Sequence, residues 1–123
     1  MRLVDPPENP PAPEITFEDF RRPDIRAGTV LAAAPHGGVR RPSIRPVIAF
    51  GPGIGEWNSF AQITAHYQAA AQVGRQVAAV VSFLPRQIGK FISEILTLRF
   101  ADAAGETVLF SPDQPVPNGA HLA

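Results

Sequence analysis

The chain has 123 residues, with 11 basic and 11 acidic residues, 45% hydrophobic residues, 14 prolines and no cysteine. This length predicts a single domain, and the lack of cysteine excludes disulfides, thiolate metal ligands and a cysteine nucleophile. No apolar run approaches the roughly 20 residues that cross a bilayer, and residues 1–6 lack the apolar segment of a secretory signal. We therefore expect a cytoplasmic protein that does not insert into a membrane.

The zero net charge conceals three segments of different sign. Residues 1–19 carry a net charge of −4 and residues 100–123 one of −3, whereas residues 20–99 carry +7. A basic middle segment suits a surface for phosphates or for another anionic partner. Charges spread over all faces of the molecule give the same sum, so the composition leaves both interpretations open.

The first elements are an extended arm and a short helix. Residues 1–14 are rich in proline and predict an arm without packed structure, so the domain itself is expected over residues 15–123. Thr16 followed by Asp19 is typical of a helix N-terminus, and Pro23 stops that helix after one or two turns.

Hydrophobic patterns and turn residues then predict a chain of strands with one internal helix. The predicted elements are strands at 24–34, 43–50 and 57–63, a helix at 65–73, strands at 77–83 and 93–100, and a short strand at 107–110. A small barrel whose internal helix follows its third strand is the OB arrangement. The sequence thus predicts an all-β fold, a five-stranded OB-fold Greek-key barrel with short flanking helices.

Glycine and proline refine this prediction at several points. Gly28 predicts a bulge or sharp bend in the first strand, and Pro46 predicts that the second strand is bulged or lies at an edge. Residues 85–90 are expected to form a loop. The proline-rich tail is too extended to pack completely on its own barrel and too apolar to be a free end, which predicts self-association through residues 111–123.

The sequence lacks the motifs of catalysis and of cofactor binding. The three histidines at 36, 66 and 121 have no ligand spacing, so we expect no metal. Residues 51–55 lack the third glycine of a dinucleotide fingerprint, and Gly89-Lys90 lacks the rest of a phosphate loop. None of the serines sits in a nucleophile elbow. We therefore expect no enzyme and no cofactor.

Five stretches, read in order, resemble the tRNA-binding-domain family, and most closely its small stand-alone CsaA proteins, which are described as export-related chaperones. The matching stretches are 17–20 with 24–30, 61–64, 77–81 with 85–88, 93–96, and 112–119. The resemblance implies an OB fold, a homodimer held partly through the terminal segments, and a surface for tRNA-like RNA or for unfolded preproteins and the export machinery. It implies no catalysis.

The candidate RNA-binding residues combine basic side chains with three polar ones. They are Arg26, Arg40, Arg41, Arg45, Gln62, Arg86, Lys90, Ser93 and Glu94. Guanidinium groups suit bidentate contact with phosphate, yet exposed arginines mostly serve solubility. Ser93 and Glu94 stand where the family resemblance suggests contact with bases, but such residues also cap turns. Gln62 has two interpretations: its side chain forms hydrogen bonds with the edge of a base, or with backbone groups of an edge strand.

The candidate peptide-binding residues are aromatic. Trp57, Phe60 and Phe91 could stack on bases, hold an apolar peptide, or pack in the core or a dimer interface. Trp57 and Phe60, like Pro46 and Ala49, depart from what relatives usually carry, which weakens the RNA interpretation. We therefore expect a CsaA-like homodimeric chaperone module that binds unfolded preproteins in protein export, with a tRNA- or RNA-binding module as the alternative.

Overall fold

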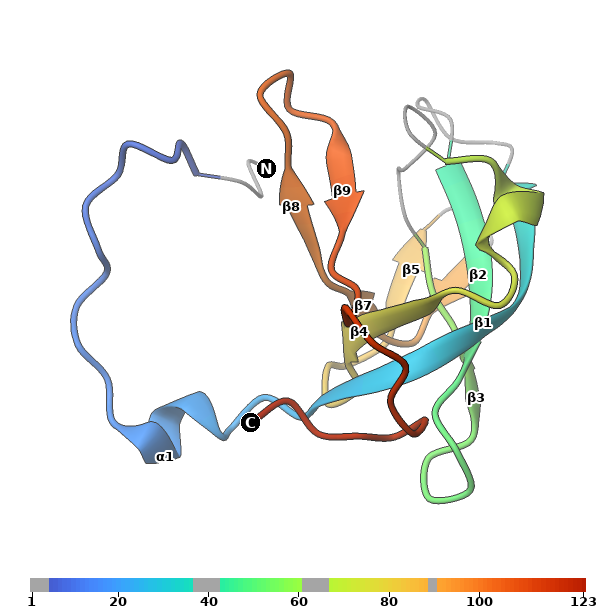
Figure 1. Ribbon diagram of the computed structural model, residues 1–123, viewed down its shortest axis with the longest axis horizontal. Helices are drawn as coiled ribbons and strands as arrows, with labels where there is room; N and C mark the ends of the chain where they lie inside the picture. The colour runs from blue at the N-terminus through green and yellow to red at the C-terminus, as the bar shows by residue number, and fades with distance from the viewer. Residues whose placement is uncertain (1–4, 37–42, 61–66, 89–90) are drawn as a thin grey trace.

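The computed structural model describes residues 5–36, 43–60, 67–88 and 91–123 (Figure 1). Its main feature is a strongly curled five-stranded sheet in the order β3-β2-β1-β4-β7, to which two hairpins, β5-β6 and β8-β9, are added. The strands of the sheet are β1 (Ile25–His36), β2 (Ser43–Ala49), β3 (Glu56–Asn58), β4 (Gln76–Val80) and β7 (Leu96–Thr97). The hairpin strands are β5 (Arg86–Ile88), β6 (Phe91–Ser93), β8 (Arg99–Ala101) and β9 (Thr107–Leu109).

The short helix α1 (Phe17–Phe20) begins where the sequence predicts it. The Thr16 hydroxyl accepts a hydrogen bond from the Asp19 amide at 3.1 Å, and the Asp19 carboxylate accepts one from the Thr16 amide at 3.3 Å. This reciprocal capping box satisfies two amides that a helix start otherwise leaves unpaired. The arm before it, residues 5–14, is exposed along its length and curves outside the sheet (Figure 1).

The core is formed by buried apolar side chains of the curled sheet and of the segments next to its strands. Ile44 and Ile48 of β2 are buried while Arg45 between them is exposed, which confirms the predicted alternation along this strand. The remaining core side chains come from β1, β4 and the segments that follow β2 and precede β7: Val30, Phe50, Val77, Ala79, Val81 and Ile95.

Gly28 does not form the predicted bulge. Its pairing with Val77 continues an unbroken register between β1 and β4, and the irregularity in β1 lies between Val30 and Ala32 instead. A Cβ atom at position 28 would lie 2.6 Å from the Ile48 side chain and 2.7 Å from that of Phe50. Glycine is therefore needed at this position for close packing.

Pro46 lies inside the sheet, so the edge position, one of the two alternatives predicted for its strand, is wrong. The pairing of β1 with β2 does contain an irregularity next to Pro46, between Val30 and Ala32 of β1 and opposite Ile48 and Val47. β2 pairs with β1 on one side and with β3 on the other. The Pro46 carbonyl accepts a hydrogen bond from the Ser59 amide at 2.9 Å, just beyond the end of β3. Because the N–H and C=O groups of one strand residue point to the same side, the missing N–H of Pro46 faces the side on which β3 has ended.

The predicted internal helix is a single 3-10 turn, η1 (Ala69–Gln72), in the part of the segment that the structure describes. Gly74, with φ of +91°, follows it and ends the turn, as glycine commonly does after a helix. The Gly74 amide donates to the Val30 carbonyl at 2.8 Å, and the Val30 amide donates to the Arg75 carbonyl at 2.9 Å. These bonds fix the turn on β1, and so short a segment cannot propagate an α-helix on its own.

The predicted strand 93–100 is divided into three pieces, and the predicted loop 85–90 contains a strand. β5 and β6 pair as a hairpin, with Arg86 opposite Ser93. The Ser93 hydroxyl then donates to the Ile95 carbonyl at 3.1 Å, which turns the chain toward β7. β7 pairs with β4, whereas β8 leaves the sheet to pair with β9. Strand propensity alone could not show these changes of partner.

Hydrogen bonds join β3 to the segment that leads into β7, so the sheet curls toward closure. The Asn58 amide donates to the Glu94 carboxylate at 2.9 Å, and the Glu94 amide donates to the Asn58 carbonyl at 2.9 Å. The buried hydroxyls of Ser59 and Thr97 are 2.7 Å apart. The result is an OB-like all-β fold, as the sequence predicts.

The C-terminal tail packs on its own chain through its last residues, while much of residues 111–123 stays exposed, so it does not pack completely. The Gly119 amide donates to the Ala27 carbonyl at 2.8 Å, the Ala27 amide to the Ala120 carbonyl at 2.9 Å, and the Leu122 amide to the Ile25 carbonyl at 2.9 Å. The tail thus runs along the first residues of β1 (Figure 1). Self-association through it stays a prediction.

Among the described residues, the helices are all too short and insufficiently apolar to span a membrane.

Candidate functional site

Several predicted site residues cannot be placed. Arg40, Arg41, Gln62 and Lys90 lie outside the described residues, and Phe91 is described only through its backbone in β6.

Arg26 is engaged within the fold. Its Nε donates to the Asp24 carboxylate at 2.6 Å, its Nη2 to the second oxygen of the same carboxylate at 3.3 Å, and its Nη1 to the Gly119 carbonyl at 3.2 Å. Its side chain is only 20% exposed. Arg26 therefore fastens the tail to the start of β1.

Arg45 lies far from Arg26 along the sheet. It is exposed on β2, opposite Ala34 of β1. Ala34 follows Arg26 by eight residues, so the two positions are separated by roughly 26 Å along an extended strand. Other bases of the middle segment pair locally: Arg21 with Glu18 at 4.0 Å and Arg99 with the Thr107 hydroxyl at 2.6 Å. The net charge of this segment thus does not become one basic patch over Arg26 and Arg45.

The aromatic candidates from the third strand are partly enclosed. Trp57 of β3 is half-buried and packs against the core cluster. Phe60 is half-buried just beyond β3. Trp57 therefore makes the core contact that was one of its three interpretations.

Ser93 and Glu94 both make structural hydrogen bonds. Ser93 is buried and holds the turn to Ile95, and the carboxylate of Glu94 is bound to the Asn58 amide. These contacts correspond to the capping interpretation of the pair. Ser93 nevertheless also lines a pocket.

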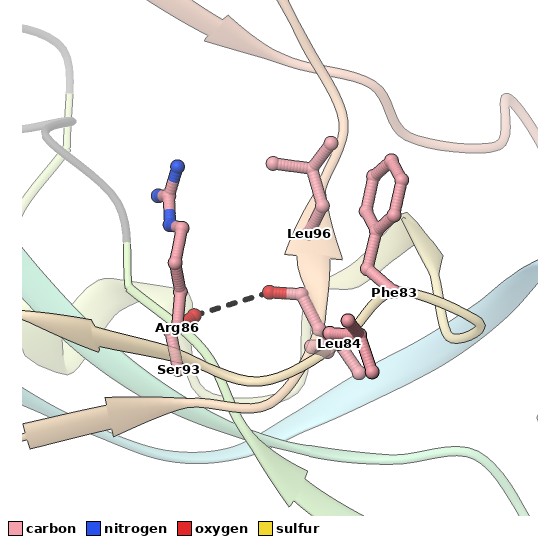
Figure 2. A pocket seen from close by; sticks show the side chains of 6 residues that line it. Phe83, Leu84, Arg86, Ser93 and Leu96 are labelled. Atoms are coloured by element: carbon pink, nitrogen blue, oxygen red, sulfur yellow. Dashed lines mark hydrogen bonds between the residues drawn. The ribbon is translucent and has the colours of Figure 1, made fainter.

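This pocket, of about 360 Å³, lies between the end of β4, the β5-β6 hairpin and β7 (Figure 2). We call it the apolar pocket; its lining residues are Phe83, Leu84, Arg86, Ser93, Ile95 and Leu96. Leu84 is 90% exposed, Phe83 54% and Leu96 39%. Exposed apolar side chains that gather around a hollow are typical of a binding surface rather than of a solvated one.

Among the described residues that line the apolar pocket, Arg86 is the positively charged one. Figure 2 shows Arg86, Leu96 and Phe83 projecting to the same side, with Arg86 at one end of the row and Phe83 at the other. No described residue forms a hydrogen bond or ion pair with the guanidinium. The pocket therefore offers an apolar wall beside a cation that is free to bind an anionic group.

Phe83, Leu84 and Leu96 are lining residues that the sequence does not single out. The sequence predicts a strand that continues to Phe83, but β4 ends at Val80 and the buried residues end at Val81. Pro85 is the signal in the sequence, because proline has no N–H to donate and therefore does not continue a paired central strand.

A second hollow, of about 550 Å³, lies between α1, the start of β1 and the C-terminal tail. Its lining includes Phe17, Phe20 and Leu122, all of which expose large apolar surfaces. We call this the terminal hollow.

Comparisons with known proteins place this fold. The crystal structure of the chaperone CsaA from Bacillus anthracis is 40% identical, covers 90% of this chain and all of its own, and has a TM-score of 0.84. The CsaA chaperone from Picrophilus torridus is 37% identical, covers 89% of this chain and all of its own, and has a TM-score of 0.81. The chain belongs to the tRNA-binding-domain family, close to CsaA. The predicted resemblance is thus confirmed.

Methionine–tRNA ligases contain a related segment. The ligase of Methanothrix thermoacetophila is 36% identical over 111 residues, which is 89% of this chain. The chain spans only 14–16% of the length of the ligases that it matches, and the match lies in their tRNA-binding domain rather than in a catalytic domain. No family model matches the chain.

Proposed function

We propose that this chain is a CsaA-like, non-enzymatic chaperone module that acts in the cytoplasm on unfolded preproteins in protein export. The observation that carries the proposal is the open apolar pocket with its exposed Phe83, Leu84 and Leu96. Its 40% identity with a CsaA chaperone over 90% of the chain supports the same function.

The chemistry of the apolar pocket suits an extended, unfolded segment. Each apolar side chain that enters the pocket removes surface from water on both partners, which contributes roughly 25 cal/mol per Å². The exposed Arg86 adds charge-assisted binding of a carboxylate or a backbone carbonyl. Such a site requires only apolar side chains and one anionic or carbonyl oxygen in its ligand. It can therefore bind segments of many different sequences, which is what a chaperone needs.

The test is suppression of aggregation. Light scattering of a chemically unfolded client protein is followed at equimolar chain, with Phe83→Ser, Leu84→Ser as the double variant. We expect the double variant to lose the suppression. Val73→Ser is the matched control, because Val73 is 52% exposed, close to the 54% of Phe83, and lies outside the pocket. Equal suppression by the double variant and the unchanged chain would refute the proposal.

We also propose that the chain forms a homodimer through the terminal hollow. Phe17, Phe20 and Leu122 expose apolar surface there, and the His121 imidazole lies 3.8 Å from the Asp24 carboxylate, which keeps the tail beside the start of β1. A second copy placed on this face would cover apolar groups from both chain ends.

Sedimentation equilibrium tests the dimer. Phe17→Asp is expected to give monomer, and Phe100→Asp is the control because the two side chains are 67% and 62% exposed. A dimer that survives Phe17→Asp but is lost in Phe100→Asp would place the interface on the β8-β9 hairpin and overturn the proposal.

RNA binding is the second candidate, and the kinship with methionine–tRNA ligases favours it. In this case Arg86, with the bases outside the described residues, would contact phosphates. Counterion release then makes the affinity for tRNA fall steeply as salt rises. Titration of labelled tRNA at low and moderate salt decides the matter, because a flat titration at both concentrations would remove this candidate.

A further inference from the structure

The N-terminal arm, residues 5–14, is a solvated segment with an unusual composition. All ten residues are exposed, and the Asn9 amide donates to the Pro6 carbonyl at 3.1 Å in a local turn. Five of the ten are prolines, and Asp5, Glu8 and Glu14 add three negative charges without a base. Prolines hold such a segment near the extended polyproline conformation, which lowers the entropy lost when it binds.

The apolar pocket presents the complementary chemistry. Arg86 carries a positive charge that no described residue neutralises, and Leu84 is 90% exposed beside it. Glu14 is followed directly by Ile15, which is itself 64% exposed. The carboxylate of Glu14 could bind the guanidinium of Arg86 while the neighbouring aliphatic side chain of Ile15 packs on the apolar wall of the pocket. Extended proline-rich segments dock on apolar, aromatic-lined surfaces of this kind.

The segment that follows the arm and α1 is fixed to the fold at Asp24, close to the apolar pocket. The Asp24 amide donates to the Ser82 hydroxyl at 3.0 Å, and the Val81 amide donates to the Asp24 carbonyl at 2.8 Å. Ser82 immediately precedes Phe83, the first residue of the pocket lining. Glu14 lies ten residues before Asp24. With the four residues of α1 kept helical, the segment between Glu14 and Asp24 can span roughly 25 Å. The chain length therefore suffices for the arm and α1 to swing together about Asp24 until Glu14 reaches the pocket.

We propose that residues 8–15 of the arm are an internal ligand of the apolar pocket, with Glu14 on Arg86 and with Ile15 and the adjacent prolines on Phe83 and Leu84. The structure shows the open arrangement, and the proposal adds a closed one in exchange with it. Tethering gives the arm a high effective concentration at the pocket. Insofar as the pocket is also the client site, which rests on the proposed function, client and arm exclude each other.

The first test measures the closed arrangement without any client. Because the chain has no cysteine, Ala12→Cys provides a single site for a spin label. We expect paramagnetic broadening of the amide signals of Leu84, Arg86 and Ser93 in the full chain, and its loss in Arg86→Glu. Broadening that is equal to that of residues remote from the pocket, or that Arg86→Glu leaves unchanged, would overturn the proposal.

A mixed sample separates the tethered arm from that of a second copy. When ¹⁵N-labelled chains without the spin label are combined with unlabelled chains that carry it, the tethered arm predicts no broadening at Leu84. Broadening in this mixture assigns the occupant to another copy and contradicts the tethered arrangement.

The second test uses a charge exchange. Glu14→Arg is expected to open the pocket, which raises the affinity for a client peptide about threefold. Combining it with Arg86→Glu is expected to restore the broadening. An unchanged broadening in Glu14→Arg, or none in the combined variant, refutes the pairing. A client that binds none of these chains while the broadening persists would contradict the proposed function alone.

Discussion

Arg26 and Arg86 belong to the same predicted set but occupy opposite environments. Arg26, at the junction of β1 and the tail, donates hydrogen bonds to the Asp24 carboxylate and to the Gly119 carbonyl. Arg86, at the apolar pocket, has no such partner among the described residues. Two arginines of the same predicted set thus differ in whether their guanidinium groups are hydrogen-bonded within the fold. Residue type alone therefore does not define a binding surface.

The largest expected effect is on stability at the tail junction. Arg26→Ala removes charge-assisted hydrogen bonds and leaves the Gly119 carbonyl and the Asp24 carboxylate without them, so the free energy of unfolding should fall by about 2 kcal/mol. Urea denaturation measures it. Arg86→Ala is the matched control and should stay within about 0.5 kcal/mol of the unchanged chain. If both variants lost the same free energy of unfolding, the proposed difference between the two arginines would be wrong.

The next effect is on binding at the apolar pocket. Arg86→Ala should weaken an apolar peptide that carries a carboxylate about tenfold, which corresponds to about 1.4 kcal/mol. Arg26→Ala should leave this affinity unchanged at a temperature where it is folded. Isothermal titration gives both values. A tenfold loss in Arg26→Ala with none in Arg86→Ala would reverse the assignment of the two regions.

The smallest effect concerns a single side-chain contact of the tail. The Thr29 hydroxyl donates to the Asn118 side-chain oxygen at 2.7 Å, in an exposed position. Thr29→Val should lower the free energy of unfolding by about 0.5–1 kcal/mol, without a change in peptide affinity. Ser111→Ala, which removes an exposed hydroxyl before the tail reaches β1, is the control. If Thr29→Val changed peptide affinity, the junction and the pocket would not be separate regions.

Local signals were sufficient for much of the fold. Thr16 and Asp19 set the helix start through a capping box, and Gly74 ended the helical turn through its positive φ. The alternation of Ile44, Arg45 and Ile48 set the buried side of β2. Each of these features depends on neighbours within a few residues, which is why the sequence could predict them.

Long-range partners explain what the sequence could not predict. Gly119 lies 93 residues from Arg26, and Asn58 lies 36 residues from Glu94. No local sequence pattern can therefore predict these hydrogen bonds. The apolar pocket arises because β4 stops at Val80 and leaves Phe83 and Leu84 exposed. The charge of Arg86 is visible in the sequence, but its lack of a partner among the described residues depends on the fold.

The most direct test of the account is a ¹⁵N NMR titration of the full chain with an unfolded segment of a preprotein. The account predicts that amide shifts concentrate at Leu84, Arg86, Ser93 and Leu96, and that Leu84→Ser reduces the affinity. Shifts confined to the start of β1 and the tail, with Leu84→Ser binding as tightly as the unchanged chain, would contradict it.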